Sequence, residues 1–241
     1  MTSLLRRRFD PDARAGLRLS LLVLALVAIA AVVLPLGVLV RDAWDPLADL
    51  DQRVDDRAHV LVLDHGWLLA AARLLTHLGA PLLMDLSTAL LAVALYRVGR
   101  RRSALFVVLC TAGAYLLSTV GKVVVGRERP SFSDAVSIAQ GASFPSGHAT
   151  GSAAFYAAAA VALLPVLRNR WRRVAVTIAI AVPLVVAATR VLLGVHYPSD
   201  VTAGLLLGWG WTLACTAVFA TWRHEEGRRG STWRRGVESA P

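Results

Sequence analysis

Six long apolar segments divide this chain, and they restrict it to folds in which a lipid bilayer surrounds much of the protein. A helix needs roughly 20 apolar residues to cross about 30 Å of hydrocarbon. Hydrophobic residues make up 56% of the chain, and the mean hydropathy of +0.57 is too high for an ordinary soluble domain. We therefore predict an all-α integral membrane protein built as a six-helix bundle. The predicted spans cover residues 17–40, 82–98, 104–125, 149–167, 174–193 and 201–222.

Clusters of arginine lie at alternate ends of these six segments, which predicts their orientation. Basic loops remain on the cytoplasmic side of a membrane, so we expect a multi-pass protein of the cell membrane with both termini cytoplasmic. The net charge of +10 then belongs to the loops rather than to a nucleic-acid-binding face. The clusters lie within residues 6–18, 97–102, 168–173 and 223–235.

The two ends of the chain differ in composition from the membrane segments between them. We expect a cytoplasmic N-terminal tail at residues 1–16, a membrane domain at 17–222 and a cytoplasmic C-terminal tail at 223–241. The residues after Trp222 are rich in Arg, Gly and Ser, a composition that favours disorder.

One further segment, residues 59–78, is apolar enough to be a seventh span. A crossing there would place two arginine clusters outside, against the rule for basic loops. His65, Arg73 and His77 recur at multiples of four and share one helical face. We therefore predict an interfacial helix on the outer surface near residues 60–78.

Lys122 is the single lysine among 26 basic residues, and it lies near the outer end of the third apolar segment. A lysine there can simply extend its amine to the membrane interface. If the helix continues, however, Lys122 and Arg129 lie two turns apart on one face, where both cations can bind one anion. Pro130 then ends the helix, and Arg127 and Glu128 are expected to face water.

A second polar cluster, residues 143–148, stands directly before the fourth apolar segment and reads Ser-Phe-Pro-Ser-Gly-His. A hydroxyl residue and a glycine before an apolar run indicate a helix N-terminus, for which a plain cap is the simplest interpretation. The same N-terminus presents unpaired N–H groups that suit a phosphate, and Gly147 allows a close approach. His148 beside such a site is suited to proton transfer.

The third cluster joins Arg190, His196 and Asp200 around the start of the sixth apolar segment. Pro198 fits the first turn of that helix. Asp200 can accept a hydrogen bond from one ring nitrogen of His196 and leave the other free for nucleophilic attack. Alternatively, Asp200 only complements the helix dipole at its first turn.

Together these three clusters closely resemble the three-part signature of the type 2 phosphatidic acid phosphatase family, which includes bacterial lipid pyrophosphatases and vanadium haloperoxidases. Thr189 stands where that family usually has serine, and it keeps the hydroxyl group. The resemblance implies that His196 is the nucleophile, Asp200 its partner and His148 the general acid. It also implies a phosphate site made by Lys122, Arg129, Ser146, Gly147 and Arg190.

We expect a membrane phosphatase that hydrolyses a lipid phosphate or diphosphate at the outer face through a phosphohistidine. Polyprenyl diphosphates such as undecaprenyl diphosphate, phosphatidic acid and phosphatidylglycerophosphate are all options at the level of the family. A lipid phosphotransferase with the same intermediate and a non-catalytic lipid-phosphate carrier are the alternatives. The expected partners are the lipid substrate and membrane lipids, with no nucleic acid, no metal and no cofactor.

Overall fold

A computed structural model of the chain describes the backbone of residues 11–237 and, without gaps, the side chains of residues 33–219. The described residues form helices and loops, with no β-strand among them. The helices are α2 (Pro11–Arg41), α3 (Asp45–Asp64), α4 (Gly66–Leu75), the 3₁₀-helix η1 (Thr76–Gly79), α5 (Pro81–Arg97), α6 (Arg101–Val125), α7 (Gly147–Leu163), α8 (Asn169–Leu192) and α9 (Pro198–Val237).

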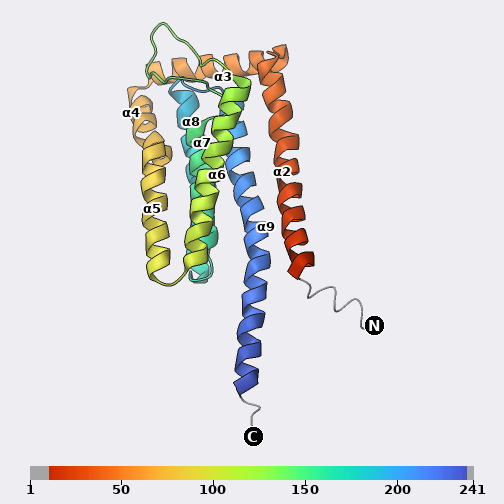
Figure 1. Cartoon of the computed structure of the whole chain (residues 1–241). Coiled ribbons are helices and arrows are strands. Elements are labelled where there is room, and N and C mark those ends of the chain that lie inside the picture. The colour runs from red at the N-terminus through yellow and green to blue at the C-terminus, as the bar shows by residue number, and fades with distance from the viewer. Residues whose placement is uncertain (1–10, 238–241) are drawn as a thin grey trace.

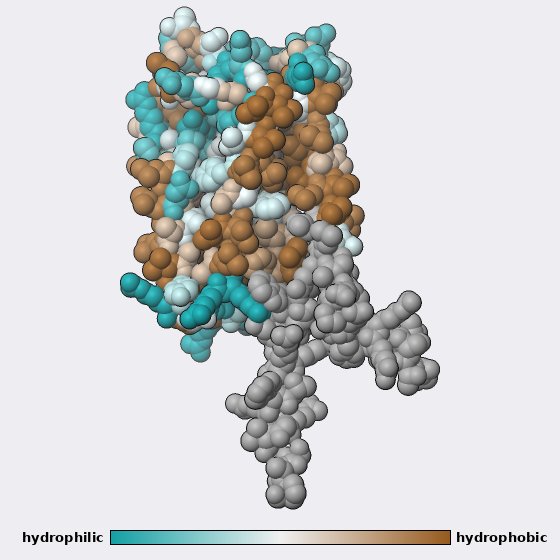
Figure 2. Space-filling view, viewed as in Figure 1, coloured by the Kyte–Doolittle hydropathy of each residue, from teal (hydrophilic) through white to brown (hydrophobic). Residues whose placement is uncertain are grey.

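Helices α2, α5, α6, α7, α8 and α9 run side by side, and α3 lies across one end of them (Figure 1). Hydrophobic residues cover much of the side of the bundle seen in Figure 2, and hydrophilic residues gather towards its two ends. Helix α7 packs against α6, α8 and α9 and is therefore the central helix. This arrangement and the apolar helices identify a multi-pass membrane protein.

Three of the predicted spans are confirmed as helices long and apolar enough to cross a bilayer: Arg101–Val125, Asn169–Leu192 and Pro198–Phe219. Helices α5 and α7 follow the predicted spans 82–98 and 149–167, but each has 17 residues. This length is at the short end of the roughly 17–25 residues that span a membrane. The count of six spans therefore stays a prediction.

The boundaries of the two ends also differ from the expected ones. Helix α2 begins at Pro11, ahead of the predicted start of the membrane domain at residue 17. Helix α9 continues to Val237, into the predicted tail at 223–241. The division into tails and membrane domain stays a prediction.

The predicted interfacial helix near residues 60–78 is displaced in the structure. The helix that lies across the bundle is α3, at residues 45–64, and the chain then bends by 112° into Gly66–Gly79. His65, whose backbone is not helical, separates the two helices. Sequence composition explains the break, because α3 carries most of the acidic residues of this region and α4 is apolar, so α4 turns inward and packs on α8.

Close packing of α7 depends on glycines in the neighbouring helices. A Cβ atom on Gly204 of α9 would lie 2.7 Å from the carbonyl oxygen of Ser146, and one on Gly208 would overlap the carbonyl oxygen of Thr150. Small residues allow this near approach of helix backbones in membrane proteins, where lipid provides little force to drive helices together. The N-terminus of α7 is thereby held directly against the first turns of α9.

The ends of the bundle differ in charge. The α5–α6 and α7–α8 connections, which carry the arginines of residues 97–102 and 168–173, lie at the end away from α3 (Figure 1). The long loop 126–146 and the α8–α9 connection lie at the α3 end. All three polar clusters identified in the sequence belong to this second end.

Candidate active site

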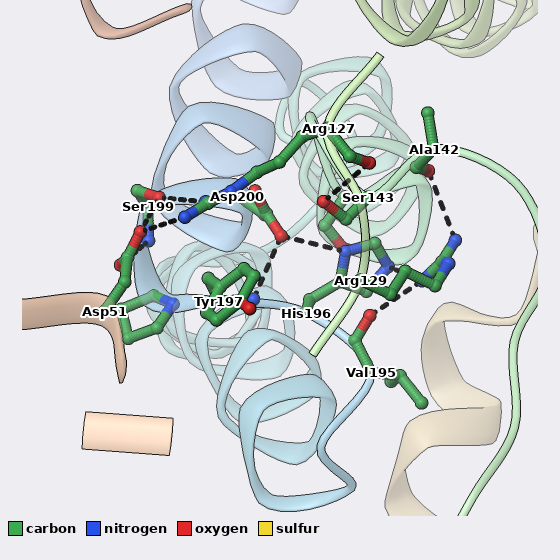
Figure 3. A network of polar contacts seen from close by, with 12 residues as sticks. Asp51, Arg127, Arg129, Ala142, Ser143, Val195, His196, Tyr197, Ser199 and Asp200 are labelled. Atoms are coloured by element: carbon green, nitrogen blue, oxygen red, sulfur yellow. Dashed lines mark hydrogen bonds and ion pairs between the residues drawn. The ribbon is translucent and has the colours of Figure 1, made fainter. Parts of the chain in front are cut away.

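The predicted site residues are brought together beneath α3, from four helix ends and two connecting segments. Lys122 is in the last turn of α6, and Arg190 is in the last turn of α8. Ser146, Gly147 and His148 form the start of α7, and Asp200 is in the first turn of α9. The loop 126–146 brings Arg129 to the same place, as Figure 3 shows for part of this network. His196 lies in the short α8–α9 connection, directly before α9.

His196 and Asp200 are both buried and face one another. The Nδ1 atom of His196 is 3.5 Å from Oδ2 of Asp200, and the backbone N–H of Tyr197 donates to the same oxygen at 2.9 Å. Burial lowers the pKa of His196 to about 4, although the interaction with Asp200 opposes this change. A lowered histidine pKa means that the ring is neutral at pH 7, so Nε2 keeps a lone pair.

The free nitrogen of His196 is directed at Arg129. Nη1 of Arg129 is 3.1 Å from Nε2 of His196 and donates to the carbonyl oxygen of Val195 at 2.7 Å. Burial lowers the pKa of Arg129, and the charge of Asp200 opposes this effect. A guanidinium and a neutral imidazole nitrogen thus meet at one point, where an incoming phosphate would contact both.

The N-terminus of α7 supplies further donors. The backbone N–H of Ser146 is held by the carbonyl oxygen of Asp200 at 3.0 Å. The Ser146 hydroxyl makes no capping hydrogen bond, and its buried Oγ has no hydrogen-bond partner among the described residues. The plain-cap interpretation is therefore wrong, since a capping serine would bond the first turn of its helix. The hydroxyl and the first N–H groups of α7 remain available to an anion.

Lys122 and Arg190 complete a cluster of cations. Nζ of Lys122 donates to the carbonyl oxygen of Ala142 at 2.6 Å, and Arg129 reaches that oxygen at 3.3 Å. Nη1 of Arg190 donates to Thr76 Oγ1 at 3.0 Å, while its buried Nε has no partner among the described residues. Among the described residues, Lys122, Arg129 and Arg190 form no ion pair with a carboxylate. Lys122, Arg129 and Arg190 concentrate positive charge here, which complements the negative charge of a phosphate.

The path of the chain between Lys122 and Arg129 differs from the prediction of a continuous helix. Helix α6 ends at Val125, and Gly126 follows with a φ of 64°, a left-handed conformation that glycine adopts readily at helix ends. Arg129 reaches the site from the loop instead. His148 is half-buried at the start of α7 and lies within electrostatic range of Arg190 and His196.

The structure contradicts the prediction that Arg127 faces water, whereas Glu128 is exposed as expected. The side chain of Arg127 is only 15% exposed and bridges two carboxylates. Its Nη1 lies 2.9 Å from Asp200 Oδ1, and its Nη2 lies 2.8 Å from Asp51 Oδ2. The sequence did carry a signal, because Asp51, Asp55 and His59 recur every four residues and so share one face of α3.

The loop 126–146 is fastened to α3 and α4 over the site. The Phe132 ring stacks on the His59 ring with centroids 3.9 Å apart. Asp134 accepts a hydrogen bond from His59 at 2.8 Å, which lowers the pKa of this exposed carboxyl group. Arg73 of α4 donates to the carbonyl oxygen of Val136 at 2.9 Å. The loop therefore closes one side of the anion site.

We predict that orthovanadate raises the melting temperature of the purified protein, because ligands that bind only the folded state stabilise it. Arg190→Lys should weaken vanadate binding about tenfold, since a lysine does not reproduce the planar set of donors of an arginine. Arg97→Lys, at an exposed position at the far end of the bundle, is the matched control. Equal vanadate shifts in both variants would place the anion elsewhere.

Known proteins share sequence with the part of the chain that contains these residues. The family model described as PAP2 superfamily matches residues 103–224. The chain is 40% identical over 124 residues to lipid A 1-phosphatase from Rhizobium etli, covering 44% of this chain and 49% of the relative. It is 36% identical over 154 residues to decaprenylphosphoryl-5-phosphoribose phosphatase from Mycobacterium tuberculosis, covering 61% and 78%.

The fold also has a solved counterpart. A transmembrane PAP2 type phosphatidylglycerolphosphate phosphatase from Bacillus subtilis superposes with a TM-score of 0.68 at 24% identity, covering 83% of this chain and 94% of that one. The matched region spans about half the length of the lipid A 1-phosphatases. The family model covers residues 103–224 and contains all the predicted site residues, so this chain belongs to the PAP2 superfamily.

Proposed function

We propose that this protein is an integral membrane phosphatase that hydrolyses a lipid phosphate or diphosphate through a phosphohistidine intermediate. One observation carries the proposal: the neutral, buried His196 is backed by Asp200, and its free nitrogen opens onto the cation cluster. A binding protein needs only the cations and N–H donors. A nucleophile with its orienting carboxylate, together with the nearby His148, is the arrangement that a two-step transfer requires.

The first step begins with Nε2 of His196, which attacks phosphorus as the bond to the leaving oxygen breaks. Arg129 then moves its hydrogen bond from Nε2 to a phosphate oxygen. Asp200 stabilises the positive charge that develops on the ring. His148 enters this step protonated, because the negative charge of the bound phosphate offsets the burial and the nearby cations that lower its pKa. It delivers that proton to the departing oxygen, and the products are a phosphohistidine and the dephosphorylated lipid.

In the second step His148 acts as the base that activates a water molecule. Water attacks phosphorus, the P–N bond to His196 breaks, and inorganic phosphate leaves. Charge is spread over three equatorial oxygens during each transfer. Lys122, Arg129, Arg190, the Ser146 hydroxyl and the Gly147 amide are placed to stabilise that charge, which is the role that metal ions take in other phosphatases. We propose that the reaction is metal-independent.

An apolar groove supports a lipid as the substrate. A cavity of about 360 Å³ lies between α2 and α6 and is lined by residues such as Val33, Gly37, Gly121 and Val124. It reaches Phe144 and Pro145, directly before Ser146 of the phosphate site. The hydrocarbon tail of the substrate would lie in this groove while its phosphate reaches the cations. Polyprenyl diphosphate, phosphatidic acid and phosphatidylglycerophosphate all have a suitable tail.

The site is proposed to work at the outer face of the membrane, with both termini in the cytoplasm. The support is the segregation of the arginine-rich connections to the opposite end of the bundle (Figure 1), because basic loops stay in the cytoplasm.

A labelling experiment tests this orientation. We expect a membrane-impermeant thiol reagent to label Ser131→Cys in intact cells, since Ser131 is exposed in the loop 126–146. Val98→Cys, 70% exposed in the α5–α6 connection, should label only after the cells are opened. The native Cys110 and Cys215 are buried and give the background. The reverse pattern would invert the topology.

Phosphate release measures the activity. Purified protein should release inorganic phosphate from a panel of the three lipid classes, and the rate should be unchanged by EDTA. His196→Ala should lower this rate about a thousandfold or more, as expected when a nucleophile is removed. Activity that EDTA abolishes and a divalent ion restores would contradict the mechanism. Transfer to a second lipid without phosphate release would identify a phosphotransferase.

Trapping of the intermediate distinguishes the two histidines. In His148→Ala, a substrate with a good leaving group should still phosphorylate His196 while attack by water is slow. Acid-labile, base-stable phosphate should therefore accumulate on the protein. It should be absent in His196→Ala, and Asp200→Asn should keep residual turnover because the nucleophile remains but is poorly oriented. Phosphate bound to His148 instead would reverse the two roles.

A further inference from the structure

Helix α3 presents a row of buried polar residues to the active site. Asp51, Asp55 and His59 are 1%, 0% and 5% exposed, and they share the face of α3 that meets the bundle. Burying a carboxylate is costly unless other groups compensate its charge. The partners of Asp51 therefore indicate what this helix does.

Asp51 binds the first turn of α9 and the loop arginine together. Its Oδ1 accepts from the backbone N–H of Ser199 at 3.0 Å, and its Oδ2 accepts from the Ser199 hydroxyl. The same Oδ2 accepts from Nη2 of Arg127 at 2.8 Å. Asp51 thus satisfies an N–H at the beginning of α9, where helix N–H groups lack partners within the helix.

Arg127 carries this connection on to the catalytic pair. Its Nη1 contacts Asp200 Oδ1 at 2.9 Å, while Asp200 Oδ2 is the oxygen that faces His196. The guanidinium also lies over the Tyr197 ring, 4.0 Å from its centroid. Burial opposes the charge on Arg127, but the attraction of Asp200 and the hydrogen bonds to both carboxylates outweigh it and raise its pKa.

We propose that Asp51 and Arg127 are positioning residues, through which α3 sets the orientation of Asp200 and the negative charge that Asp200 presents to His196. The inference rests on the proposed function for the role of His196 as nucleophile. Both residues act through Asp200. Asp200 lies on the Nδ1 side of the His196 ring, and the cation cluster lies on the Nε2 side. Arg127 pairs with Asp51 as well as with Asp200, so it neutralises Asp200 only in part. Asp200 therefore keeps the negative charge with which it holds the His196 ring.

The arrangement has two opposite consequences for His196. Arg127→Gln removes a cation from Asp200, so the carboxylate attracts a protonated ring more strongly and the pKa of His196 rises. Asp51→Asn removes a competing carboxylate, so Arg127 neutralises Asp200 more fully and the pKa of His196 falls. If this pair had a purely structural role, the two substitutions would not shift the pKa of His196 in opposite directions.

Other charged groups also face His196, and they set its starting pKa. Asp200 approaches from α9, Arg129 from the loop, Arg190 from α8 and His148 from α7. Asp55 of α3, whose pKa burial raises to about 7, acts on Asp200 and Arg127. The two substitutions leave all five side chains in place. The comparison between variants therefore isolates the contribution of Asp51 and Arg127.

The test is an NMR titration of ¹⁵N-histidine-labelled protein in detergent, with the His196 signal assigned from His196→Gln. We expect the midpoint for His196 to rise in Arg127→Gln, to fall in Asp51→Asn, and to return towards the native value in the double variant. Asp56→Asn is the matched control, because Asp56 is exposed on the same helix and bonds Gln52 at 2.8 Å. Shifts in the same direction, or shifts no larger than in Asp56→Asn, would overturn the proposal.

Turnover provides a second, separate measurement. Asp51→Asn keeps the shape of the side chain, and we expect it to lower kcat about tenfold or more with little change in KM, as when a group behind a reactive histidine is removed. An equal rise in KM with unchanged kcat would also overturn the proposal. If the native protein releases no phosphate, the proposed function fails, whereas the titration still decides the role of Asp51 and Arg127. If Arg127→Gln does not fold, Arg127→Lys keeps a cation and should shift the His196 midpoint less than Asp51→Asn.

Discussion

The carboxylate of Asp200 is fully buried at the end of a membrane bundle, and such a charge is stable only where donors surround it. One oxygen faces His196 and accepts the Tyr197 N–H, and the other accepts from Arg127. The backbone carbonyl of the same residue holds the N–H of Ser146. Asp200 therefore connects His196, the N-terminus of α7 with its unpaired donors, and the loop 126–146. The positions of His196, Ser146 and Arg127 depend on this one residue.

The packing of the central helix makes such a polar cluster possible within an apolar bundle. Ser146 can approach Asp200 because α7 and α9 are separated by little more than their backbones at Gly204 and Gly208. Larger residues there would separate the α7 N-terminus from the α9 first turn. The unpaired N–H groups of α7 and the His196 ring would then no longer face the same point. Small residues in these helices thus serve the site as well as the fold.

Much of the site could be predicted from the sequence because its residues stand at segment ends. Lys122, His148, Arg190 and His196 all adjoin apolar segments, and alternating basic clusters indicated that these ends share one side of the membrane. The contribution of α3 could not be predicted in this way. Its acidic residues suited a hydrated outer segment, and only their spacing of four distinguished Asp51 and Asp55 from exposed neighbours such as Asp56. Arg127 was missed for the same reason, since its partners lie 73 and 76 residues away in the chain.

The apolar groove between α2 and α6 ends beside Pro145, and Gly121 leaves room for that proline against α6. In the proposed binding mode, a fixed length of protein, from the groove to Ser146, separates the lipid tail from the phosphate. Such a lipid would stay within its leaflet, with only its phosphate in the polar end of the bundle. Selection between lipids would then depend on the spacing between hydrocarbon and phosphorus, and the chemical group beyond the phosphate would project towards the loop 126–146.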